Sequence, residues 1–546
     1  MKKFPLIITL ILTICACKKE APVPKRDYLA EFETYFTRNF ESLIAQEQDS
    51  LAWVQQLYAQ RKFQPIWTAD SLRLSPIAYD LISTLTNAQA YGLEPFYYEV
   101  NEIHTSERKL AHGNSDQERL EALGNLELLL SRNYMKFGKH LNVGILENVD
   151  TIVEIPRKKF TVNLPSYINK AAQADSLIPY LLRLQPQHLD YKNLQRAMAN
   201  YIKTASFSTE NVPVVNFRVD SLKSVEAAKK ALILHQYLSE DLKDSLYLSA
   251  LTKFQVDHAL QPDSLIGSNT ARALSTSPYE YYQKLKVSLE RWRWKNEWSG
   301  RYVFVNIPTY HLTVYEGDSL LQKHRVVVGS RSNQTPEIVD TLQYIIAYPY
   351  WNVPKRISVE EILVKAQNDS TYLKRNQYQV SLKGETIDPK SVNWKEVTPA
   401  SFNYRIRQNG GGINALGYVK FIFPNKDAIY FHDTPTKSHF SKEIRAYSHG
   451  CIRVQDALSL ADFFLKEDKN KYTQDSLRTF IKRKKEKWMH LNTVLPVYLY
   501  YIPTTANKQG DIVFHQDVYN LDKTWIQLMS NQSKEKTTLV SQRSKG

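Results

Sequence analysis

Cysteine is scarce in this sequence, with three residues among 546. Cys15 and Cys17 lie close to the N-terminus, so Cys451 is the one thiol in the remainder of the chain. One thiol excludes a framework of disulfides and leaves too few ligands for a zinc site built from cysteines. In a protein that is exported to an oxidising compartment, an unpaired thiol is a candidate reactive group.

The N-terminal leader lacks a hydrophobic run that is long enough to cross a membrane. Phe4–Ala16 is apolar over about a dozen residues, whereas a spanning helix needs about 20. The run follows the basic start Met1-Lys2-Lys3, as the core of a signal peptide does. We therefore predict an exported protein, with a signal peptide at residues 1–17 and a polar tether at residues 18–44.

The leader ends in Ile14-Cys15-Ala16-Cys17, which resembles the lipobox of bacterial lipoproteins. This resemblance implies a lipid anchor on Cys17 and a location on the periplasmic side of the cell envelope. A lysine rather than an aspartate at position 18 favours the outer membrane over the inner one. The alternative is an ordinary secretory signal in which both cysteines are incidental.

Nucleic-acid-binding motifs are also absent, although the net charge is +15. A basic protein is suited to a polyanionic partner, such as anionic lipid or an acidic cell-wall polymer. The simpler alternative is that the lysines keep the surface soluble. The densest basic run, Lys482–Lys487, has the pattern of one exposed helix face. We expect no nucleic-acid partner.

The chain is long enough for two to four domains. Apolar residues recur at helical spacing between about residues 27 and 215, and again in a compact unit at residues 221–278. From Arg301 the pattern alternates with every second residue, which predicts strands. An insert at about residues 352–405 interrupts these strands and has the size of a lid. The predicted fold class is multidomain α+β.

Cys451 has the surroundings expected of a nucleophile. Attack on a carbonyl needs a thiolate, and a free thiol is only a few per cent ionised near neutral pH. His432 ends a predicted strand, so the sheet would hold its imidazole in place to take the thiol proton and leave a thiolate–imidazolium pair. Asp433 and Thr434 follow it and offer groups that could orient the ring.

The neighbours of Cys451 add further functional groups. The backbone N–H groups of Gly450 and Cys451 are suited to an oxyanion hole, and the glycine leaves room for a substrate. His449 is a second candidate base or a substrate contact, and the charge of Arg453 could lower the pKa of the thiol or hold a substrate carboxylate. Two alternatives stay open, a buried structural cysteine and a zinc site formed by His432, His449 and Cys451.

Two stretches of the sequence carry a resemblance to a known family. Tyr430-Phe431-His432-Asp433-Thr434-Pro435, followed by Ser448-His449-Gly450-Cys451-Ile452-Arg453-Val454, is similar to the active-site signature of the L,D-transpeptidase (YkuD) family. In the large, multidomain branch of this family, a helical scaffold and a peptidoglycan-binding module precede a catalytic domain with a capping insert. Similarity to that branch extends to Glu290–Trp294, Tyr350–Pro354, Arg407-Gln408, Asn414–Gly417 and Lys420–Asn425. Similarity to the binding module lies in Phe254-Gln255, Leu260, Asp263, Ile266-Gly267, Thr270 and Ala273-Leu274.

The resemblance implies acyl transfer on peptidoglycan, and we expect neither a metal nor a cofactor. Cys451 would attack the carbonyl of the third residue of a tetrapeptide stem, and the terminal D-alanine would leave. The side-chain amine of a neighbouring stem would resolve the thioester in a 3→3 cross-link. The implied roles are proton donor and acceptor for His432, oxyanion hole for His449 and Gly450, and substrate binding for Tyr430, Ser448, Arg453 and Asn414. Carbapenem-type inhibitors are expected to acylate the thiol.

Two alternative functions remain open. The same thioester could be resolved by water, which gives an L,D-carboxypeptidase, or could serve to attach or detach a protein at the diamino acid. A non-catalytic wall-binding lipoprotein is the alternative from another class. The predicted domains after the tether are a helical scaffold (45–220), a peptidoglycan-binding-like module (221–280), a linker helix that acts as a hinge (281–300), a catalytic domain (301–505) and a C-terminal tail (506–546).

Overall fold

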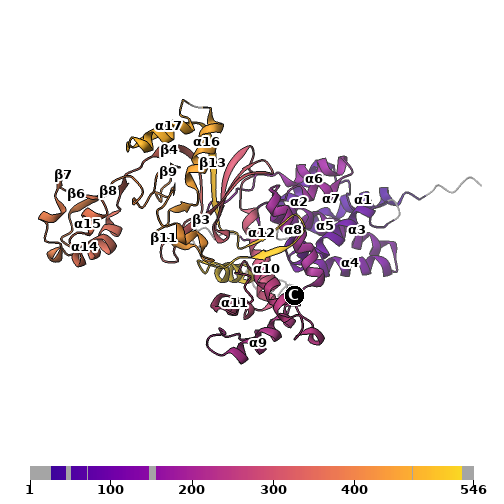
Figure 1. Ribbon diagram of the computed structural model, residues 1–546. Helices are drawn as coiled ribbons and strands as arrows, with labels where there is room; N and C mark the ends of the chain where they lie inside the picture. The colour runs from indigo at the N-terminus through magenta and orange to yellow at the C-terminus, as the bar shows by residue number, and fades with distance from the viewer. Residues whose placement is uncertain (1–25, 45–50, 70–71, 147–154, 470, 532–546) are drawn as a thin grey trace, which may run out of the picture.

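The computed structural model describes residues 26–44, 51–69, 72–146, 155–469 and 471–531. The predicted signal peptide and Cys17 lie outside these residues. Figure 1 shows a helical N-terminal part on one side of a central β domain, a cap on its other side and a small helical module below. Within the described ranges, no helix is both long and apolar enough to span a membrane. The prediction of a multidomain α+β fold is confirmed.

The helical N-terminal part is built around the long helix α5. At its start the Ser115 hydroxyl accepts a hydrogen bond from the N–H of Glu118, and at its end Gly144 takes a φ of +84°. Nearly every residue of its second half is buried against the surrounding helices. The helices are α1 (Tyr28–Ile44), α2 (Leu51–Arg61), α3 (Pro76–Thr86), α4 (Val100–His112), α5 (Asp116–Val143), α6 (Leu164–Gln173), α7 (Leu177–Leu182) and α8 (Leu189–Thr204).

Helix α1 corrects the predicted tether at residues 18–44. Phe32, Phe36 and Phe40 lie at a spacing of four residues and are buried in the core of the helical part. Such a spacing places all three rings on one face of a helix, so α1 packs as part of the scaffold. Residues 18–25 of the predicted tether lie outside the described residues.

Helix α12 (Pro278–Arg293) was predicted as a hinge, and the structure contradicts this. Ser277 and Glu280 cap its start in a reciprocal pair of hydrogen bonds. Glu290 is fully buried and accepts hydrogen bonds from the backbone N–H groups of Ile145 and Leu146 at the end of α5. Because α12 is buried along almost its whole length between the helical part and the β domain, it joins them firmly.

The three-helix module consists of α9 (Ser221–Leu234), α10 (Tyr247–Asp257) and α11 (Ser268–Leu274). It has a separate small core that includes Leu232, Leu251 and Phe254. His258 is buried in this module, and its Nδ1 lies 2.7 Å from the carbonyl oxygen of Phe254. His258 is therefore a core residue. No partner ligands for a metal are spaced near it in the sequence, which agrees with this position.

The β domain is one large sheet in the order β11-β3-β12-β10-β9-β4-β13-β1-β2. The sheet closes on itself because the long strand β3 pairs with β2 through its first half and with β12 through its second half. Its apolar interior is covered at one side by α16 (Ala457–Asp468), and α17 (Gln474–Lys482) packs beside it. The strands are β1 (Arg301–Asn306), β2 (His311–Glu316), β3 (Ser319–Gly329), β4 (Ile338–Ala347), β9 (Val419–Ile422), β10 (Phe431–His432), β11 (Ala446–Ser448), β12 (Ile452–Val454) and β13 (Lys487–Tyr500).

The predicted insert forms a cap that projects from the β domain (Figure 1). It has its own sheet in the order β5-β8-β6-β7 and its own core, which includes Leu363, Leu373 and Trp394. A separate core allows the cap to keep its shape as a unit. Its elements are β5 (Trp351–Asn352), α13 (Lys355–Ile357), the π-helical segment η5 (Ser358–Leu363), α14 (Val364–Asn368), α15 (Tyr372–Arg375), β6 (Tyr378–Leu382), β7 (Glu385–Ile387) and β8 (Tyr404–Gln408).

The predicted C-terminal tail is folded through residue 531, which is a second correction to the domain boundaries. Strands β14 (Thr504–Ala506) and β15 (Ile512–Phe514) form a hairpin. A helix at residues 522–531 then carries Trp525 into the core of the helical part, with its ring centroid 4.8 Å from that of Trp294. The end of the described chain therefore holds the β domain against the scaffold.

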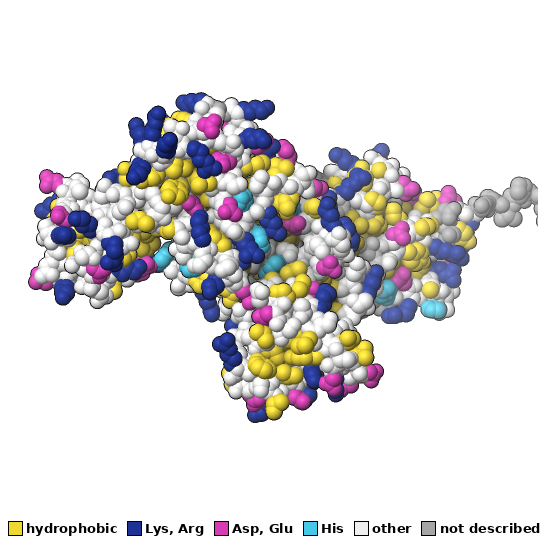
Figure 2. Space-filling model, viewed as in Figure 1, with side chains coloured by type: hydrophobic (Ala, Val, Ile, Leu, Met, Phe, Trp, Pro, Cys, Tyr) yellow, Lys and Arg dark blue, Asp and Glu magenta, His cyan; other side chains and the backbone are white. Residues whose placement is uncertain are grey.

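Positive charge is unevenly distributed over the surface. Figure 2 shows Lys and Arg side chains gathered at the end of the molecule that carries α17, and elsewhere interspersed with acidic side chains. The basic run from Lys482 to Lys485 is exposed there, as predicted, but it is not a helix face, because α17 ends at Lys482 and the following residues form a turn.

Candidate active site

Three adjacent strands, β9, β10 and β12, place the predicted catalytic residues on one face of the sheet. His432 pairs with Lys420 of β9 on one side and with Arg453 of β12 on the other. Tyr430 precedes His432 by two residues, and Cys451 precedes Arg453 by two, so all five side chains share this face. The intervening residues of the strands fill the apolar core of the domain, namely Val419, Phe421, Phe431, Ile452 and Val454.

His432 is oriented by a backbone group. Its Nδ1 lies 2.5 Å from the carbonyl oxygen of Asp433, and since a carbonyl can only accept, Nδ1 carries the proton. Burial, together with the nearby charges of Arg453 and Lys420, lowers the pKa of His432 to about 3. The imidazole is therefore neutral near pH 7, with Nε2 unprotonated and ready to accept a proton.

The sequence suggested that Asp433 or Thr434 could orient the His432 ring. In the structure the carboxylate of Asp433 does not do so. It accepts a hydrogen bond from the N–H of Tyr418 at 3.0 Å and pairs with Lys437. A side chain on Gly417 would collide with it, because an added Cβ would lie 2.2 Å from Oδ2. Asp433 thus fixes the loop that leads into β9, and its backbone supports His432.

The thiol of Cys451 lies in a partly buried position among polar groups. Burial raises its pKa, and this outweighs the opposite effects of Tyr430, Lys420 and Arg453. Tyr430 contributes twice, through hydrogen bonds from its backbone N–H and from its hydroxyl to the sulfur. The raised pKa favours a neutral thiol in the free protein, whereas the sequence led us to expect a thiolate–imidazolium pair.

Ser448 and Gly450 shape the turn that carries the thiol. The Ser448 hydroxyl donates to the carbonyl of Cys451 at 2.5 Å and accepts from the N–H of Gly450 at 3.2 Å. Gly450 has a φ of +114°, which favours glycine, and its carbonyl accepts a hydrogen bond from Thr335 at 2.6 Å. Both residues belong to the turn, and the hydroxyl of Ser448 is engaged in hydrogen bonds within the turn.

The predicted oxyanion hole needs one correction. The N–H of Gly450 already donates to the Ser448 hydroxyl, so it is not available to an oxyanion. Gly450 contributes to the site through the backbone conformation of the turn. Among the hydrogen bonds of the described residues, none uses the N–H of Cys451, which leaves that donor for a developing oxyanion.

His449 contacts the cap. Its Nε2 lies 2.5 Å from Oε1 of Glu361 in the π-helical segment η5. Its ring is therefore engaged away from the thiol, and His432 is the residue whose ring nitrogen is available as a base. Arg453 lies near a second histidine, His439, with Nη1 and Nδ1 3.2 Å apart.

A cavity of about 730 Å³ between the cap and the sheet contains the site. The predicted residues Tyr430, His432, Ser448, His449, Cys451 and Arg453 all line it. The cap supplies the opposite wall with Trp351, Glu361, Lys365, Tyr372 and Tyr378. A cavity of this size accommodates a peptide of a few residues.

Asn414 was predicted to bind substrate, but the structure gives it a different role. It is fully buried, and its amide donates to the carbonyl of Asn409 at 2.8 Å, with a longer contact to that of Pro349. Its own carbonyl accepts from the N–H of Leu416 at 2.7 Å. Asn414 thus ties together the two chain segments through which the cap joins the sheet.

Sequence reasoning missed three residues of the cavity. Trp351 donates a hydrogen bond from its indole to the Tyr430 hydroxyl, and the Lys420 ammonium lies 3.6 Å from the centre of the Tyr430 ring. Trp351 and Lys420 lie in stretches that resemble the family, and this resemblance could have identified them as residues of the site. Glu361 lies in the polar insert, where nothing in the sequence marks it.

A metal centre has no support in the part of the chain that the structure describes. No group of three His, Cys, Asp or Glu side chains there is arranged to hold a metal ion. His449 and His432 are engaged by Glu361 and by the Asp433 carbonyl, respectively.

Comparison with known proteins agrees with the geometry. Residues 300–471 match the L,D-transpeptidase catalytic domain (YkuD), and residues 52–198 match a scaffold domain. A curated protein of Haemophilus influenzae, named "Putative L,D-transpeptidase", is 36% identical over 242 residues. This match covers 44% of the chain and 48% of the relative, so the chain spans about half the length of the curated relative it matches. Residues 300–471, which carry Cys451 and His432, therefore form a domain similar to the catalytic domain of the YkuD family of L,D-transpeptidases.

Proposed function

We propose that this protein is a cysteine L,D-transpeptidase that forms 3→3 cross-links in peptidoglycan. The observation that carries the proposal is that Cys451, which directly precedes β12, and His432 of the adjacent strand β10 lie on the same face of the sheet. His432 is neutral there, and its Nε2 is free to accept a proton. The family match supports acyl transfer on peptidoglycan. The cavity under the cap supports a peptide as the donor.

The first half-reaction follows from the protonation states of the two residues. As the Cys451 sulfur attacks the carbonyl of the third stem residue, His432 Nε2 takes the thiol proton. The N–H of Cys451 stabilises the oxyanion of the tetrahedral intermediate. The imidazolium then gives its proton to the departing amine of D-alanine, the C–N bond breaks, and a thioester remains on Cys451.

The second half-reaction uses the same base. The side-chain amine of a neighbouring stem attacks the thioester carbonyl, and His432 removes the proton that this amine loses. The C–S bond breaks, the thiolate recovers the proton from the imidazolium, and the new amide is the cross-link. Arg453 and Lys420, whose charges lie at the edge of the site, are suited to hold the carboxylates of the stems.

Muropeptide analysis tests the cross-linking activity. Purified protein is incubated with sacculi that carry tetrapeptide stems, and the products are separated after digestion of the glycan. We expect 3→3 dimers with the native chain and none with Cys451→Ala. Cross-links that persist in Cys451→Ala would overturn the assignment of the nucleophile.

The same experiment separates the two other uses of the thioester. Tripeptides without dimers would identify an L,D-carboxypeptidase, in which water resolves the thioester. Release or capture of a protein at the diamino acid would identify an attachment or detachment enzyme. The open cavity beside Cys451 admits each of these acceptors, and cross-linking is preferred because of the family match.

A non-catalytic wall-binding lipoprotein is the candidate from another class. The three-helix module at residues 221–280 and the net positive charge favour wall binding in either case. A Cys451→Ala protein that binds sacculi as the native chain does, while the native chain makes no product, would favour this candidate.

We also propose that the chain is an outer-membrane lipoprotein anchored through Cys17 and facing the periplasm. The lipobox-like Ile14-Cys15-Ala16-Cys17 supports this placement. Mass spectrometry of the N-terminal peptide from membranes would detect the lipid, and Cys17→Ala should release the protein into the soluble fraction. A carbapenem should add its mass to the Cys451 peptide, and no mass shift in that peptide would argue against an acylable thiol.

A further inference from the structure

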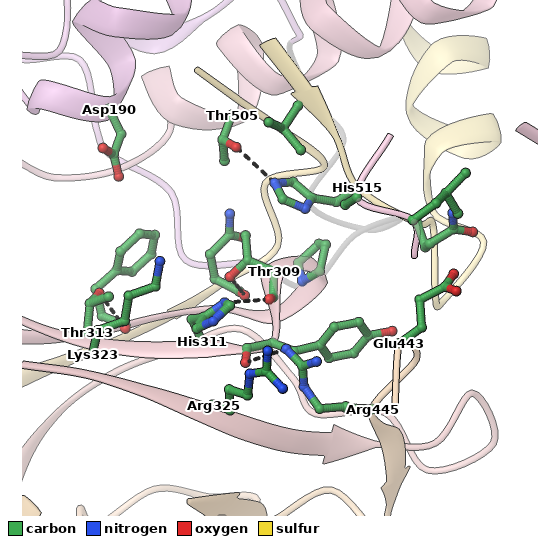
Figure 3. A pocket seen from close by; sticks show the side chains of 18 of the residues that line it. Asp190, Thr309, His311, Thr313, Lys323, Arg325, Glu443, Arg445, Thr505 and His515 are labelled. Atoms are coloured by element: carbon green, nitrogen blue, oxygen red, sulfur yellow. Dashed lines mark hydrogen bonds between the residues drawn. The ribbon is translucent and has the colours of Figure 1, made fainter. Parts of the chain in front are cut away.

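A second cavity, of about 520 Å³, lies where the β domain meets the three-helix module and the β14–β15 hairpin. Strands β2 and β3, the loop before β11 and residues 259–261 of the module contribute to its walls. Figure 3 shows this cavity, with His515 and Thr505 of the hairpin facing the side chains of the β domain across it. It is separate from the cavity that contains Cys451, and its volume also suits a short peptide.

Three cationic side chains meet on one wall of this second cavity. Lys323 and Arg325 come from β3, and Arg445 comes from the loop that leads into β11. In Figure 3, Arg325 and Arg445 lie side by side, with His311 next to them. In the described part of the chain, none of Lys323, Arg325 and Arg445 forms an ion pair with a carboxylate. None of these three positive charges is thus neutralised by an ion pair within the described ranges.

Arg445 shows most clearly that the wall favours an anion. Its side chain is 7% exposed, and its guanidinium donates only to backbone carbonyls, those of Val326, Lys442 and Tyr310. Burial, together with the nearby charge of Arg325, lowers the pKa of Arg445 to about 10. Carbonyl dipoles compensate a buried charge only in part, so an anion in the cavity would be bound favourably.

The two histidines of the cavity do not supply extra charge. Burial lowers the pKa of His311 to about 4 and that of His515 to about 3, with Lys323 contributing in both cases. They are neutral at pH 7 and act as polar partners: His515 Nε2 lies 2.8 Å from the Thr505 hydroxyl. The charge on this wall therefore comes from the lysine and the arginines.

Two carboxylates, those of Asp190 and Glu443, also line the cavity. Asp190 and Glu443 lie on different sides of the view in Figure 3. Burial raises the pKa of Asp190 to about 6, and Glu443 accepts a hydrogen bond from Asn269 of the module at 3.0 Å. The amides of Gln261 and Asn507 complete a polar lining. A lining that offers both cations and carboxylates suits a ligand that carries carboxylates and an amine.

We propose that this cavity is a second peptide subsite, in which Lys323, Arg325 and Arg445 bind the carboxylates of a peptidoglycan stem. The choice of a stem peptide rests on the proposed function, because such stems combine several carboxylates with the amine of a diamino acid. The site lies next to the catalytic loop: the carbonyl of Arg445 accepts a hydrogen bond from the N–H of Val328 at 2.8 Å, and β11 begins at the following residue. A stem bound here would be held between the module and the strand that leads to Cys451.

Calorimetric titration of the full chain tests this subsite without turnover. The parent protein carries Cys451→Ala and is titrated with a purified disaccharide tetrapeptide at low ionic strength. The test variant adds Lys323→Ala and Arg325→Ala, both exposed positions on β3. The matched control adds Lys482→Ala and Arg483→Ala, which remove the same charge from an exposed site at the end of α17.

We expect the test variant to lose one of the binding events, or to bind the disaccharide tetrapeptide in that event at least about tenfold more weakly, because two charge-assisted contacts are removed. The control should bind as the parent does. Equal binding by the parent and the test variant would overturn the proposal. If the proposed function failed and the catalytic cavity bound no stem, the parent would still show one event that the test variant lacks.

Two further ligands identify the source of the anion. A muropeptide whose carboxylates are methyl-esterified should lose the event that depends on Lys323 and Arg325. Inorganic phosphate, compared with chloride at equal ionic strength, should displace the muropeptide only at millimolar concentration. Phosphate binding as tight as that of the muropeptide would overturn the assignment to a stem peptide.

Discussion

The Nε2 atom of His449 lies 2.5 Å from Oε1 of Glu361, so the catalytic loop is in contact with the cap. His449 precedes the nucleophile by two residues, and Glu361 belongs to the π-helical segment η5. This contact closes one side of the cavity over Cys451. It also explains why His449, although it is next to the thiol in sequence, is not placed as the base.

Replacing Glu361 with glutamine should weaken the hold of the cap on the catalytic loop. Both side chains are just over a third exposed, so the pair contributes no more than about 1 kcal/mol, and kcat/KM should fall by up to about fivefold. Steady-state kinetics with a soluble stem peptide measures this, and the effect should shrink at high salt. Glu385→Gln, an exposed position on β7, is the control. A loss in Glu361→Gln that salt leaves unchanged would contradict an electrostatic contact.

The two histidines should differ sharply when they are removed. His432→Ala deletes the general base and should lower kcat by about 10²–10⁴. His449→Ala removes only a contact to Glu361 and should lower kcat/KM by less than about tenfold. Rates of thioester formation with a stem peptide or a carbapenem distinguish the two variants. The reverse order of effects would transfer the role of base to His449.

Tyr430 should tune the reactivity of the thiol. Its hydroxyl hydrogen-bonds to the sulfur and lowers the pKa of Cys451, so Tyr430→Phe should raise that pKa. A lost hydrogen bond of about 1 kcal/mol corresponds to roughly fivefold slower alkylation by iodoacetamide at pH 7.5. Peptide mass mapping follows the modification at Cys451. Tyr447→Phe, a nearby exposed ring, should alkylate at the parental rate; equal slowing in both variants would refute a specific effect of Tyr430.

Acid should destabilise the fold through buried neutral histidines. Burial lowers the pKa values of His188, His432 and His515 to about 3 and those of His235 and His311 to about 4. The unfolded chain takes up these protons near pH 6.5 and the folded chain does not, so stability is present above pH 6.5 and is lost as the pH falls towards 4. The loss is at most about 1.4 kcal/mol per pH unit for each histidine. Asp190 and Asp522, with pKa values raised to about 6, stabilise the folded chain as the pH falls, and this offsets only part of the loss of stability.

Thermal melting between pH 7.5 and pH 4.5 measures this dependence. Tm should decrease across the range, and His235→Gln should make the decrease smaller. His112→Gln, at an exposed position on α4, should leave the slope as it is. A Tm that stays constant from pH 7.5 to pH 4.5 would show that the buried histidines do not govern acid stability.

The C-terminal helix should be required for stability. Trp525 is almost fully buried, with the Arg291 guanidinium 4.4 Å from the centre of its ring. Trp525→Ala should lower the free energy of unfolding by about 3–5 kcal/mol, because it leaves a large cavity. Denaturant titration measures this, with the half-exposed Trp488→Ala as a control. A change below about 1 kcal/mol would mean that the helix is not part of the folded unit.

The sequence predicted two of the three catalytic strands because their pattern is local. Alternating apolar residues marked β9 and β10, whereas β12, which follows Cys451 and places it on the same face as His432, was not predicted as a strand. Helix α1 agrees with the helical spacing predicted from about residue 27, but the domain boundary at residue 45 wrongly assigned it to the tether, because it follows a polar leader. The helix that contains Trp525 was missed because it carries no motif and packs against residues far away in the sequence.

By itself the sequence determined the fold class and the resemblance of residues 300–471 to an L,D-transpeptidase catalytic domain, and it proposed Cys451 and His432 as nucleophile and base, since these follow from residue types at short spacing. Only the tertiary structure decided how these residues are protonated, because burial and distant charges set the pKa values of Cys451 and His432. It also assigned Asn414 to the junction of the cap, and brought Arg445 together with Lys323 and Arg325. Contacts of this kind join segments that are far apart in the chain, and local patterns do not record them.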